Sequence, residues 1–205
     1  MARRVSAMLA GLARRYCATL ALLACVAMPA PAPGSVVGGV DLPKVIRLDG
    51  SDVRLYLNGA GIREFLSVDV YVAALYLAEP RRSLEGVLKL DQPVSLRLHF
   101  LRSISRERLI DEWVEILQRN QPPDVLPTLQ PELERSRSFF RDVHAGDTIT
   151  LDYMPDRGGR MTFDGECLGE SVGTSFFRAA LGVWLGPRPT QPSLKDLLIF
   201  GDSRK

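Results

Sequence analysis

Two side chains in residues 57–79 have the chemistry to bind an oxygen-rich group. The segment is LNGAGIREFLSVDVYVAALYLAE, and within it Arg63 and the Tyr71 hydroxyl are polar exceptions in apolar surroundings. A guanidinium is always charged and presents a planar fork of donors, so a buried arginine needs a carbonyl or carboxylate oxygen beside it. The tyrosine hydroxyl could donate a second hydrogen bond to the same oxygen. The alternative is that Arg63 pairs with a structural acid and Tyr71 fills the core.

The element that must position these residues is a strand. Residues 68–78 are rich in β-branched and aromatic side chains and are apolar at odd and even positions alike, as in a strand buried on both faces in the middle of a sheet. Residues 59–61 (Gly-Ala-Gly) predict a turn before it. Because eight residues separate Arg63 from Tyr71, both would face the same side of a continuous strand, unless a bulge near residues 66–67 intervenes.

The remaining sequence predicts an α+β domain in which an antiparallel β-sheet is packed on one face by helices. Alternating apolar and polar residues predict strands, and apolar residues at helical spacing predict helices. The predicted strands cover residues 44–49, 53–57, 68–78, 94–100, 147–154 and 160–164, and the predicted helices cover residues 83–90, 131–140, 173–185 and 190–199, with one more after Ser105. We find no internal repeat, so residues 36–201 are expected to form one domain.

Composition and charge argue against a nucleic-acid partner and a disulfide-based fold. The chain has 205 residues, of which 46% are hydrophobic, and this is enough for one core. Its formal charge of +2 becomes 22 basic against 24 acidic side chains once the four arginines of residues 1–24 are set aside. No basic stretch with interleaved aromatics remains, so we expect no nucleic-acid partner. Beyond residue 25 the one cysteine is Cys167, which cannot close an intrachain disulfide, so the fold must rest on its core.

Residues 1–32 are predicted to be an export signal with a Pro-rich lead-in. Arginines precede an apolar core at residues 16–26, which is shorter than the about 20 residues of a membrane span. Cleavage near residues 30–32 would release a periplasmic or secreted protein. In a second interpretation, residues 22–25 (Leu-Leu-Ala-Cys) resemble a bacterial lipobox, residues 1–24 are a lipoprotein signal, and a lipid on Cys25 anchors the protein to a membrane. The third alternative is an uncleaved anchor.

Several common kinds of site are absent from the sequence. His99 and His144 stand apart without acids or cysteines at ligand spacing, so we expect no metal site. The Gly-Ala-Gly segment begins like a dinucleotide fingerprint, but Glu64 stands where the third glycine belongs, so we expect no cofactor. Carboxylate pairs such as Glu112 and Glu115 are expected on a solvated helix face.

Two segments resemble the chalcone isomerase superfamily. Residues 57–63 (LNGAGIR) and 70–77 (VYVAALYL) resemble the Gly-Ala-Gly-x-Arg turn and the following strand of the plant enzymes. Residues 176–186 (FFRAALGVWLG), followed by a Pro-rich turn and a Leu-Lys pair, resemble the family's C-terminal helix pair. The resemblance covers roughly residues 40–200 and is nearest to the exported bacterial branch. It implies the chalcone isomerase-like fold, an open-faced β-sandwich.

The resemblance also implies roles for individual residues. The family's catalytic arginine, which stabilises developing phenolate or enolate charge, falls on Arg63. The threonine of true isomerases falls near Tyr71, and a tyrosine there is the pattern of the superfamily's fatty-acid-binding members, in which Arg and Tyr hold a carboxylate. The family's lysine region falls near Arg102, the candidate stand-in, and Ser175 or Thr174 falls at a late hydroxyl position. Arg63, Tyr71, Arg102 and Ser175 are therefore the predicted ligand-binding residues.

Two further catalytic positions of the family are unmatched in this chain. The catalytic tyrosine would fall near Leu109 and the asparagine near Ile116. We therefore expect a non-catalytic protein that binds a fatty acid or similar carboxylate amphiphile in an apolar cleft. One alternative is an isomerase (intramolecular lyase) acting on an aromatic, chalcone-like substrate with Arg63 as oxyanion stabiliser. The other alternative is a structural or interaction protein with no ligand.

Overall fold

An antiparallel sheet forms the centre of the computed structural model, which describes residues 34–201. The sheet has seven strands in the spatial order β3-β4-β5-β6-β7-β8-β9, and the additional strands β1 and β2 pair with each other. The strands are β1 (Ser35–Val37), β2 (Val40–Leu42), β3 (Val45–Arg47), β4 (Arg54–Phe65), β5 (Val68–Leu77), β6 (Val94–Phe100), β7 (Thr148–Met154), β8 (Gly158–Phe163) and β9 (Glu166–Val172). The predicted export signal at residues 1–32, with Cys25, lies outside the described residues.

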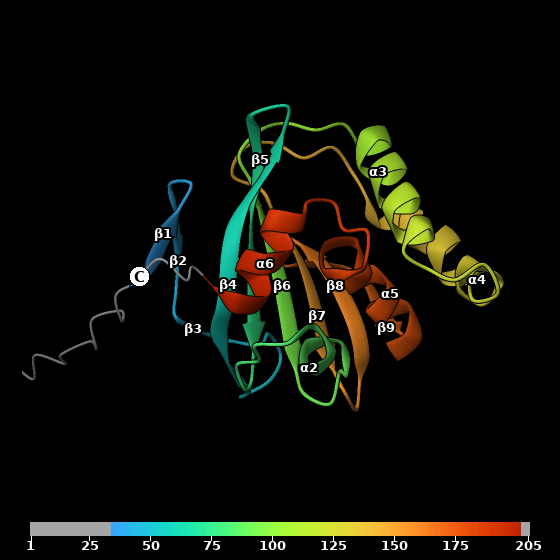
Figure 1. Ribbon diagram of the computed structural model, residues 1–205, viewed down its shortest axis with the longest axis horizontal. Helices are drawn as coiled ribbons and strands as arrows, with labels where there is room; N and C mark the ends of the chain where they lie inside the picture. Colours follow the sequence, from blue (N-terminus) through green and yellow to red (C-terminus); the bar gives the residue numbers. More distant parts are fainter. Residues whose placement is uncertain (1–33, 202–205) are drawn as a thin grey trace, which may run out of the picture. The chain divides into compact units, whose positions relative to one another are not determined.

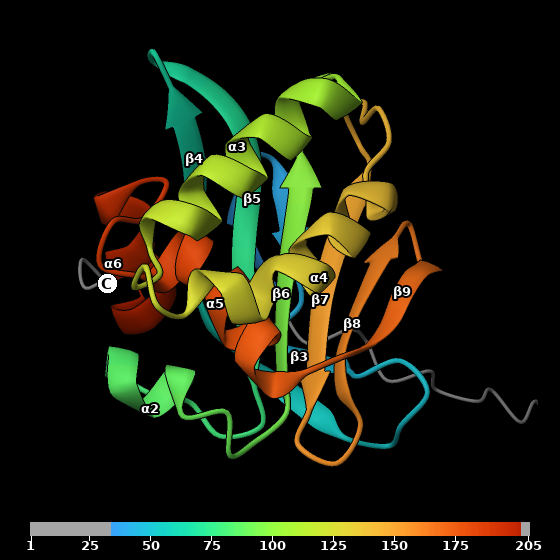
Figure 2. The same ribbon diagram turned by 90° about the vertical axis from the view of Figure 1, so that its right-hand side faces the viewer.

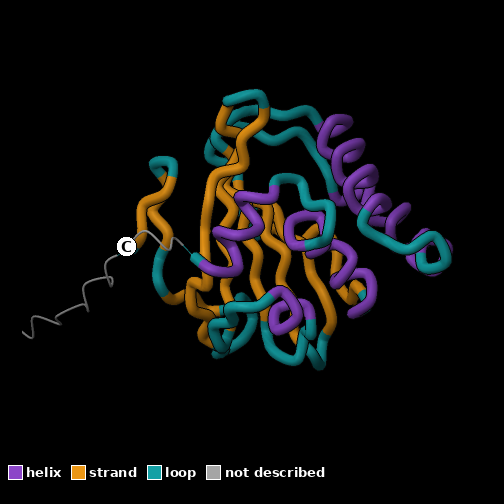
Figure 3. Tube along the Cα trace, viewed as in Figure 1, coloured by secondary structure: helices purple, strands orange, loops and turns teal. Residues whose placement is uncertain are grey.

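The helices pack on one face of this sheet (Figures 1 and 3). They are α2 (Leu84–Leu88), α3 (Arg106–Arg119), α4 (Leu126–Ser136) with the short 3₁₀ turn η1 (Arg137–Phe139), α5 (Thr174–Leu185) and α6 (Pro192–Phe200). Ser83 and Ser105 cap α2 and α3, each accepting a hydrogen bond from an amide of the first turn. Figure 2 shows α3, α4 and α5 lying across the strands. The predicted α+β architecture, with helices on one face of an antiparallel sheet, is confirmed.

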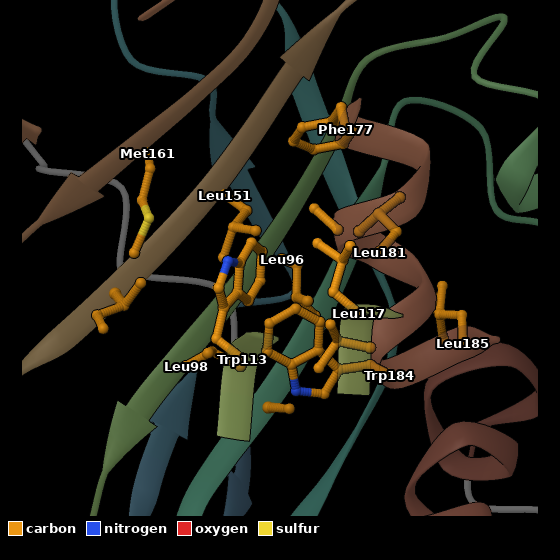
Figure 4. Close-up of a cluster of buried hydrophobic side chains, with 14 of the residues drawn as sticks. Leu96, Leu98, Trp113, Leu117, Leu151, Met161, Phe177, Leu181, Trp184 and Leu185 are labelled. Carbon is orange, nitrogen blue, oxygen red and sulfur yellow. The ribbon is translucent and has the colours of Figure 1, made fainter. Parts of the chain in front are cut away.

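The main core fills the space between the sheet and the helices. It contains side chains from α2, α3, α5 and α6 together with the helix-facing side chains of the strands. Figure 4 shows Trp113 of α3 and Trp184 of α5 among these side chains, and their ring centroids are 6.2 Å apart. Burial of this apolar surface is the main force that holds the helices on the sheet.

The opposite face of β5 packs against a second apolar cluster. Val72, Ala74 and Tyr76 are fully buried there, against residues that include Leu42 and Leu55. Residues 71, 73, 75 and 77 face the main core instead. The prediction of a central strand buried on both faces is therefore confirmed, and the segment from β1 to β3 supplies part of the covering layer.

The prediction of a Gly-Ala-Gly turn is wrong. These residues lie inside β4, where a Cβ on Gly59 would come within 2.1 Å of the Leu197 carbonyl oxygen and one on Gly61 within 2.7 Å of the Leu197 side chain. Glycine is needed because α6 approaches the strand closely, and no reversal of the chain occurs there. The turn comes later, at Leu66 and Ser67, whose φ angles are 49° and 62°.

Two element boundaries and one whole strand also differ from the sequence prediction. The strand predicted at residues 53–57 continues to Phe65 as β4, and α4 begins at Leu126, earlier than residue 131. A proline in the first turn of α4 is tolerated because the amide there has no partner within the helix. The edge strand β9 was not predicted, because its sequence ECLGESV lacks the alternation of a half-buried strand.

Candidate functional site

Arg63 and Tyr71 lie directly opposite each other on neighbouring strands. They are cross-strand partners in the β4–β5 hairpin. The register shifts immediately after Arg63: Glu64 is opposite Asp69, so Val70 has no opposing residue on β4. Opposed residues of an antiparallel pair point to the same face. The two side chains therefore lie on the same, helix-covered face of the sheet, as predicted. The reason differs from the prediction, because they lie on two strands of a hairpin and not on one continuous strand.

The Arg63 side chain is 11% exposed and has polar partners on two other elements. Its Nε donates to Thr190 Oγ1 at 2.8 Å, and its Nη2 lies 3.3 Å from Glu112 Oε1. It also donates to the Glu64 carbonyl. A strong ion pair has an N–O distance of about 2.7–2.9 Å. The contact with Glu112 is longer, and the Glu112 side chain is 41% exposed, so this carboxylate holds the guanidinium only loosely.

Tyr71 is buried, and its hydroxyl accepts a hydrogen bond from Trp184 Nε1 at 2.9 Å. Burial raises the pKa of Tyr71, and the negative charge of Glu112 raises it further. The hydroxyl is therefore neutral at physiological pH. Since its oxygen already accepts from the indole, its proton is available for an acceptor on the side of Arg63 and Thr190.

Thr190 and Glu112 are the site residues that the sequence analysis missed. Thr190 Oγ1 accepts from Arg63 and donates to Glu112 Oε1 at 3.2 Å, so it links the strand, α3 and the loop before α6. Glu112 was expected on a solvated helix face. The one sequence signal for it is its place next to Trp113, at the border of the apolar stripe of α3. In this structure Arg63 pairs with an acid and Tyr71 is buried, as the alternative interpretation of the sequence states.

A cavity of about 410 Å³ opens beside this cluster, and we call it the outer cavity. Its volume lies within the usual range for ligand sites, about 300–1,000 Å³. Its charged lining residues are three arginines (Arg63, Arg102 and Arg108) and one acid, Glu112. The other lining residues are Phe65, Leu66, Val68, Val70, Tyr71, Ser103, Ile104 and Ser105. An apolar wall with an excess of guanidinium groups suits an amphiphile that carries negative charge.

A second, smaller cavity lies in the main core, and we call it the inner cavity. It has a volume of about 50 Å³, and Tyr71 and Glu112 line both cavities. The remaining lining residues are Leu98, Phe100, Leu109, Trp113, Phe140, Ile149, Leu151, Met161, Val183, Trp184 and Thr190. A water molecule occupies about 30 Å³ of liquid, so this space is too small for an acyl chain without repacking of the core.

Of the other two predicted ligand-binding residues, one lies at the outer cavity with Arg63 and the other does not. Arg102 lies at the outer cavity, where its Nε donates to the Asp69 carbonyl at 2.7 Å. Ser175 is exposed in the first turn of α5 and lines neither cavity, so it does not join Arg63. The neighbouring Thr174 bonds to the hydroxyl of Tyr153 at 3.0 Å. Leu109, at the position of the family's catalytic tyrosine, lines the inner cavity with an apolar side chain.

Comparisons with known proteins agree with this geometry at the level of the fold. Residues 34–199 match the chalcone isomerase-like family. The crystal structure of a fatty-acid binding protein of Arabidopsis thaliana superposes with a TM-score of 0.58 at 17% sequence identity, covering 78% of this chain and 92% of that one. The comparison with curated proteins gives no match. Since the family match covers most of the sequence, the chain belongs to the chalcone isomerase-like family.

Proposed function

We propose that this protein is a non-catalytic binding protein for a fatty acid or a similar carboxylate amphiphile. The observation that carries the proposal is the outer cavity, in which Arg63, Arg102 and Arg108 stand beside an apolar wall. The structural likeness to a fatty-acid binding protein supports the same class of ligand.

In this proposal the ligand carboxylate binds at Arg63. Arg63, the Tyr71 hydroxyl and Thr190 are donors from three different elements, and Glu112 is the carboxylate that now meets two of them. An incoming carboxylate would take over the contact of Glu112, which is long and partly exposed. Partly exposed ion pairs contribute little stability, about 0–1 kcal/mol, so the exchange opposes ligand binding only weakly.

We propose that the acyl chain lies along the wall of the outer cavity. Phe65, Val68, Val70 and Ile104 provide this apolar surface, and the cavity is large enough for a ligand without rearrangement of the core. The inner cavity, at about 50 Å³, would take only the end of a chain.

Binding of dodecanoate, measured by calorimetry, tests the role of Arg63. We expect Arg63→Gln to weaken the affinity about tenfold or more, because a hydrogen bond to a charged group contributes about 1.5–3 kcal/mol. Glu112→Gln should bind dodecanoate at least as tightly as the wild type, since the competing carboxylate is gone. The matched control is Arg47→Gln, which removes an exposed arginine paired with Asp52. Equal affinities of the wild type and Arg63→Gln, or equal binding of methyl dodecanoate, would refute carboxylate recognition.

The isomerase alternative uses the same donors differently. Arg63 and the neutral Tyr71 hydroxyl could stabilise a developing oxyanion. A chalcone would also need polar groups that orient its phenol, and apart from Tyr71, Glu112 and Thr190 the inner cavity is lined by apolar and aromatic side chains. A rate of chalcone cyclisation above the spontaneous rate, lost in Arg63→Gln, would favour this alternative.

We further propose that the protein is exported, with residues 1–32 acting as the signal. Arginines followed by an apolar core and small residues support this. Intact-mass measurement of the protein purified from the envelope of its host tests the proposal. A chain beginning near residue 31 indicates ordinary cleavage, and one beginning at Cys25 with an added lipid mass indicates anchoring. An unprocessed chain in the cytoplasm would contradict export.

A further inference from the structure

The β4–β5 hairpin ends in an exposed, uncharged tip. Its residues are Phe65, Leu66, Ser67 and Val68, and the three apolar side chains are 46%, 83% and 36% exposed, respectively. Figure 2 shows this hairpin projecting beyond the end of β6. Most large apolar residues of the described chain are buried, so three of them together on a projecting turn are unusual.

The backbone makes leucine an unfavourable choice at this turn. Leu66 and Ser67 have positive φ angles of 49° and 62°, a conformation in which tight hairpin turns favour asparagine and glycine. A residue with a Cβ is strained there. Leu66 also gains little from packing, because most of its surface is exposed. The stability of the isolated fold therefore does not account for this residue, whereas an apolar environment outside the chain would.

Arginines surround the tip on the side of the outer cavity. The guanidinium carbons of Arg108 and Arg63 lie 5.2 Å and 5.9 Å from the centre of the Phe65 ring. Arg102 lines the same cavity. Glu64 on β4 and Asp69 on β5 are cross-strand neighbours directly next to the tip. The tip is thus apolar at its end. Two exposed acids, Glu64 and Asp69, flank it on the strands, and guanidinium groups lie against the Phe65 ring on the side of the outer cavity.

We propose that this tip inserts into the surface of a lipid bilayer. An apolar end enters the boundary between head groups and acyl chains, and the exposed Arg102 and Arg108 of the outer cavity meet lipid phosphates. A protein partner fits less well, because a stable protein interface buries about 800 Å² on each side, far more than three side chains on a narrow turn provide. Within the described residues no helix is long and apolar enough to cross a membrane.

Insertion of the tip would also orient the outer cavity toward the lipid. Phe65, Leu66 and Val68 line that cavity as well as forming the tip. An amphiphile could then pass between bilayer and cavity without crossing bulk water. The membrane contact itself goes beyond the proposed function and does not require that a carboxylate binds at Arg63.

Tryptophan quenching in vesicles tests this proposal directly in the full chain. Leu66→Trp would be mixed with vesicles of brominated phosphatidylcholine and phosphatidylglycerol without free fatty acid. The native Trp113 and Trp184 are buried and contribute little to quenching. We expect strong quenching for Leu66→Trp and none for the control Phe200→Trp, whose position is 52% exposed on α6. Absence of quenching for Leu66→Trp on vesicle-bound protein would overturn the proposal, even if residues 1–33 hold the chain on the vesicle.

A charged substitution provides the second measurement. In sedimentation with the same vesicles, Leu66→Asp should lower the partition coefficient about tenfold or more. Transfer of a leucine side chain out of water contributes about that factor. Phe200→Asp should leave sedimentation unchanged. If Leu66→Trp does not fold, Phe65→Trp serves as the reporter. Equal sedimentation of Leu66→Asp and the wild type, together with unquenched tryptophan at the tip, would exclude the membrane and leave a protein as the partner.

Discussion

At the scale of single residues, the site depends on the hydrogen bonds that four polar side chains make: Arg63, Glu112, Thr190 and Tyr71. Arg63 is nearly buried, and its nearest acid, Glu112, is close to half exposed. Thr190 bridges them, and Tyr71 turns its oxygen toward Trp184. The guanidinium therefore has hydrogen-bond partners, but its contact with Glu112 is replaceable. The Glu112 side chain can move into solvent at a small cost in free energy. This arrangement allows a ligand oxygen to replace Glu112.

His99 provides a test of burial that is independent of the ligand. Burial lowers the pKa of His99, and the positive charge of Arg97 lowers it further. The unfolded chain therefore binds a proton more readily, so the free energy of unfolding decreases as the pH falls through about 6.5. We expect the melting temperature of the wild type to fall more between about pH 7.5 and 5.5 than that of His99→Gln. The control His144→Gln, at an exposed histidine, should follow the wild type.

If the melting temperatures of His99→Gln and the wild type decreased equally over this pH range, the buried imidazole would not be the titrating group. Its Nδ1 lies 3.1 Å from Thr148 Oγ1, and glutamine can keep a hydrogen bond there. The comparison therefore isolates the titration from the loss of that bond.

At the scale of elements, the close approach of α6 to β4 places the loop that carries Thr190. The Asn58 side chain donates to the carbonyls of Leu198 and Ile199, and Gly59 and Gly61 have no side chain in the way of the helix. These contacts fix the end of α6 on the strand that carries Arg63. The loop before α6 then brings Thr190 to the guanidinium.

Gly59→Ala should show how closely these elements pack. The new Cβ would meet the backbone oxygens of Leu197 and Leu198 at 2.1 Å and 2.6 Å, so α6 must shift. We expect the free energy of unfolding to fall by about 2 kcal/mol or more in urea denaturation. Gly173→Ala is the control, since its backbone is extended with φ −59° and no atom lies within 4 Å of its Cβ. Similar stability of the two variants would show that α6 is not held this tightly.

At the scale of the whole described domain, the sheet has an apolar cluster on each face. The helices cover one face, and the segment from β1 to β3 contributes to the cover of the other. Leu42, Ile46 and Leu48 of that segment are buried. The segment from β1 to β3 is thus part of the packed fold and not a linker.

Leu42→Ala tests this cooperative role. Truncating a fully buried leucine should lower the free energy of unfolding by about 2–4 kcal/mol. Val36→Ala in the neighbouring strand, where the side chain is 71% exposed, should change it by less than about 0.5 kcal/mol. Denaturation followed by tryptophan fluorescence reports both, because Trp113 and Trp184 lie in the other cluster. A Leu42→Ala variant as stable as the wild type would mean that the second cluster does not fold with the first.

The sequence by itself determined the class of the fold and the importance of residues 57–79. Apolar residues at both odd and even positions identify a central strand, serine caps identify helix starts, and the motif around Arg63 identifies the family, because these signals are local. The edge strand β9 and the short strands β1 and β2 were missed because their patterns are weak. Only the tertiary structure decided what meets Arg63. Glu112 and Thr190 are 49 and 127 residues away in sequence, and no local pattern encodes such pairings. The glycines show the same limit: their composition suggested a turn, but the packing of a helix more than 130 residues later is what requires them.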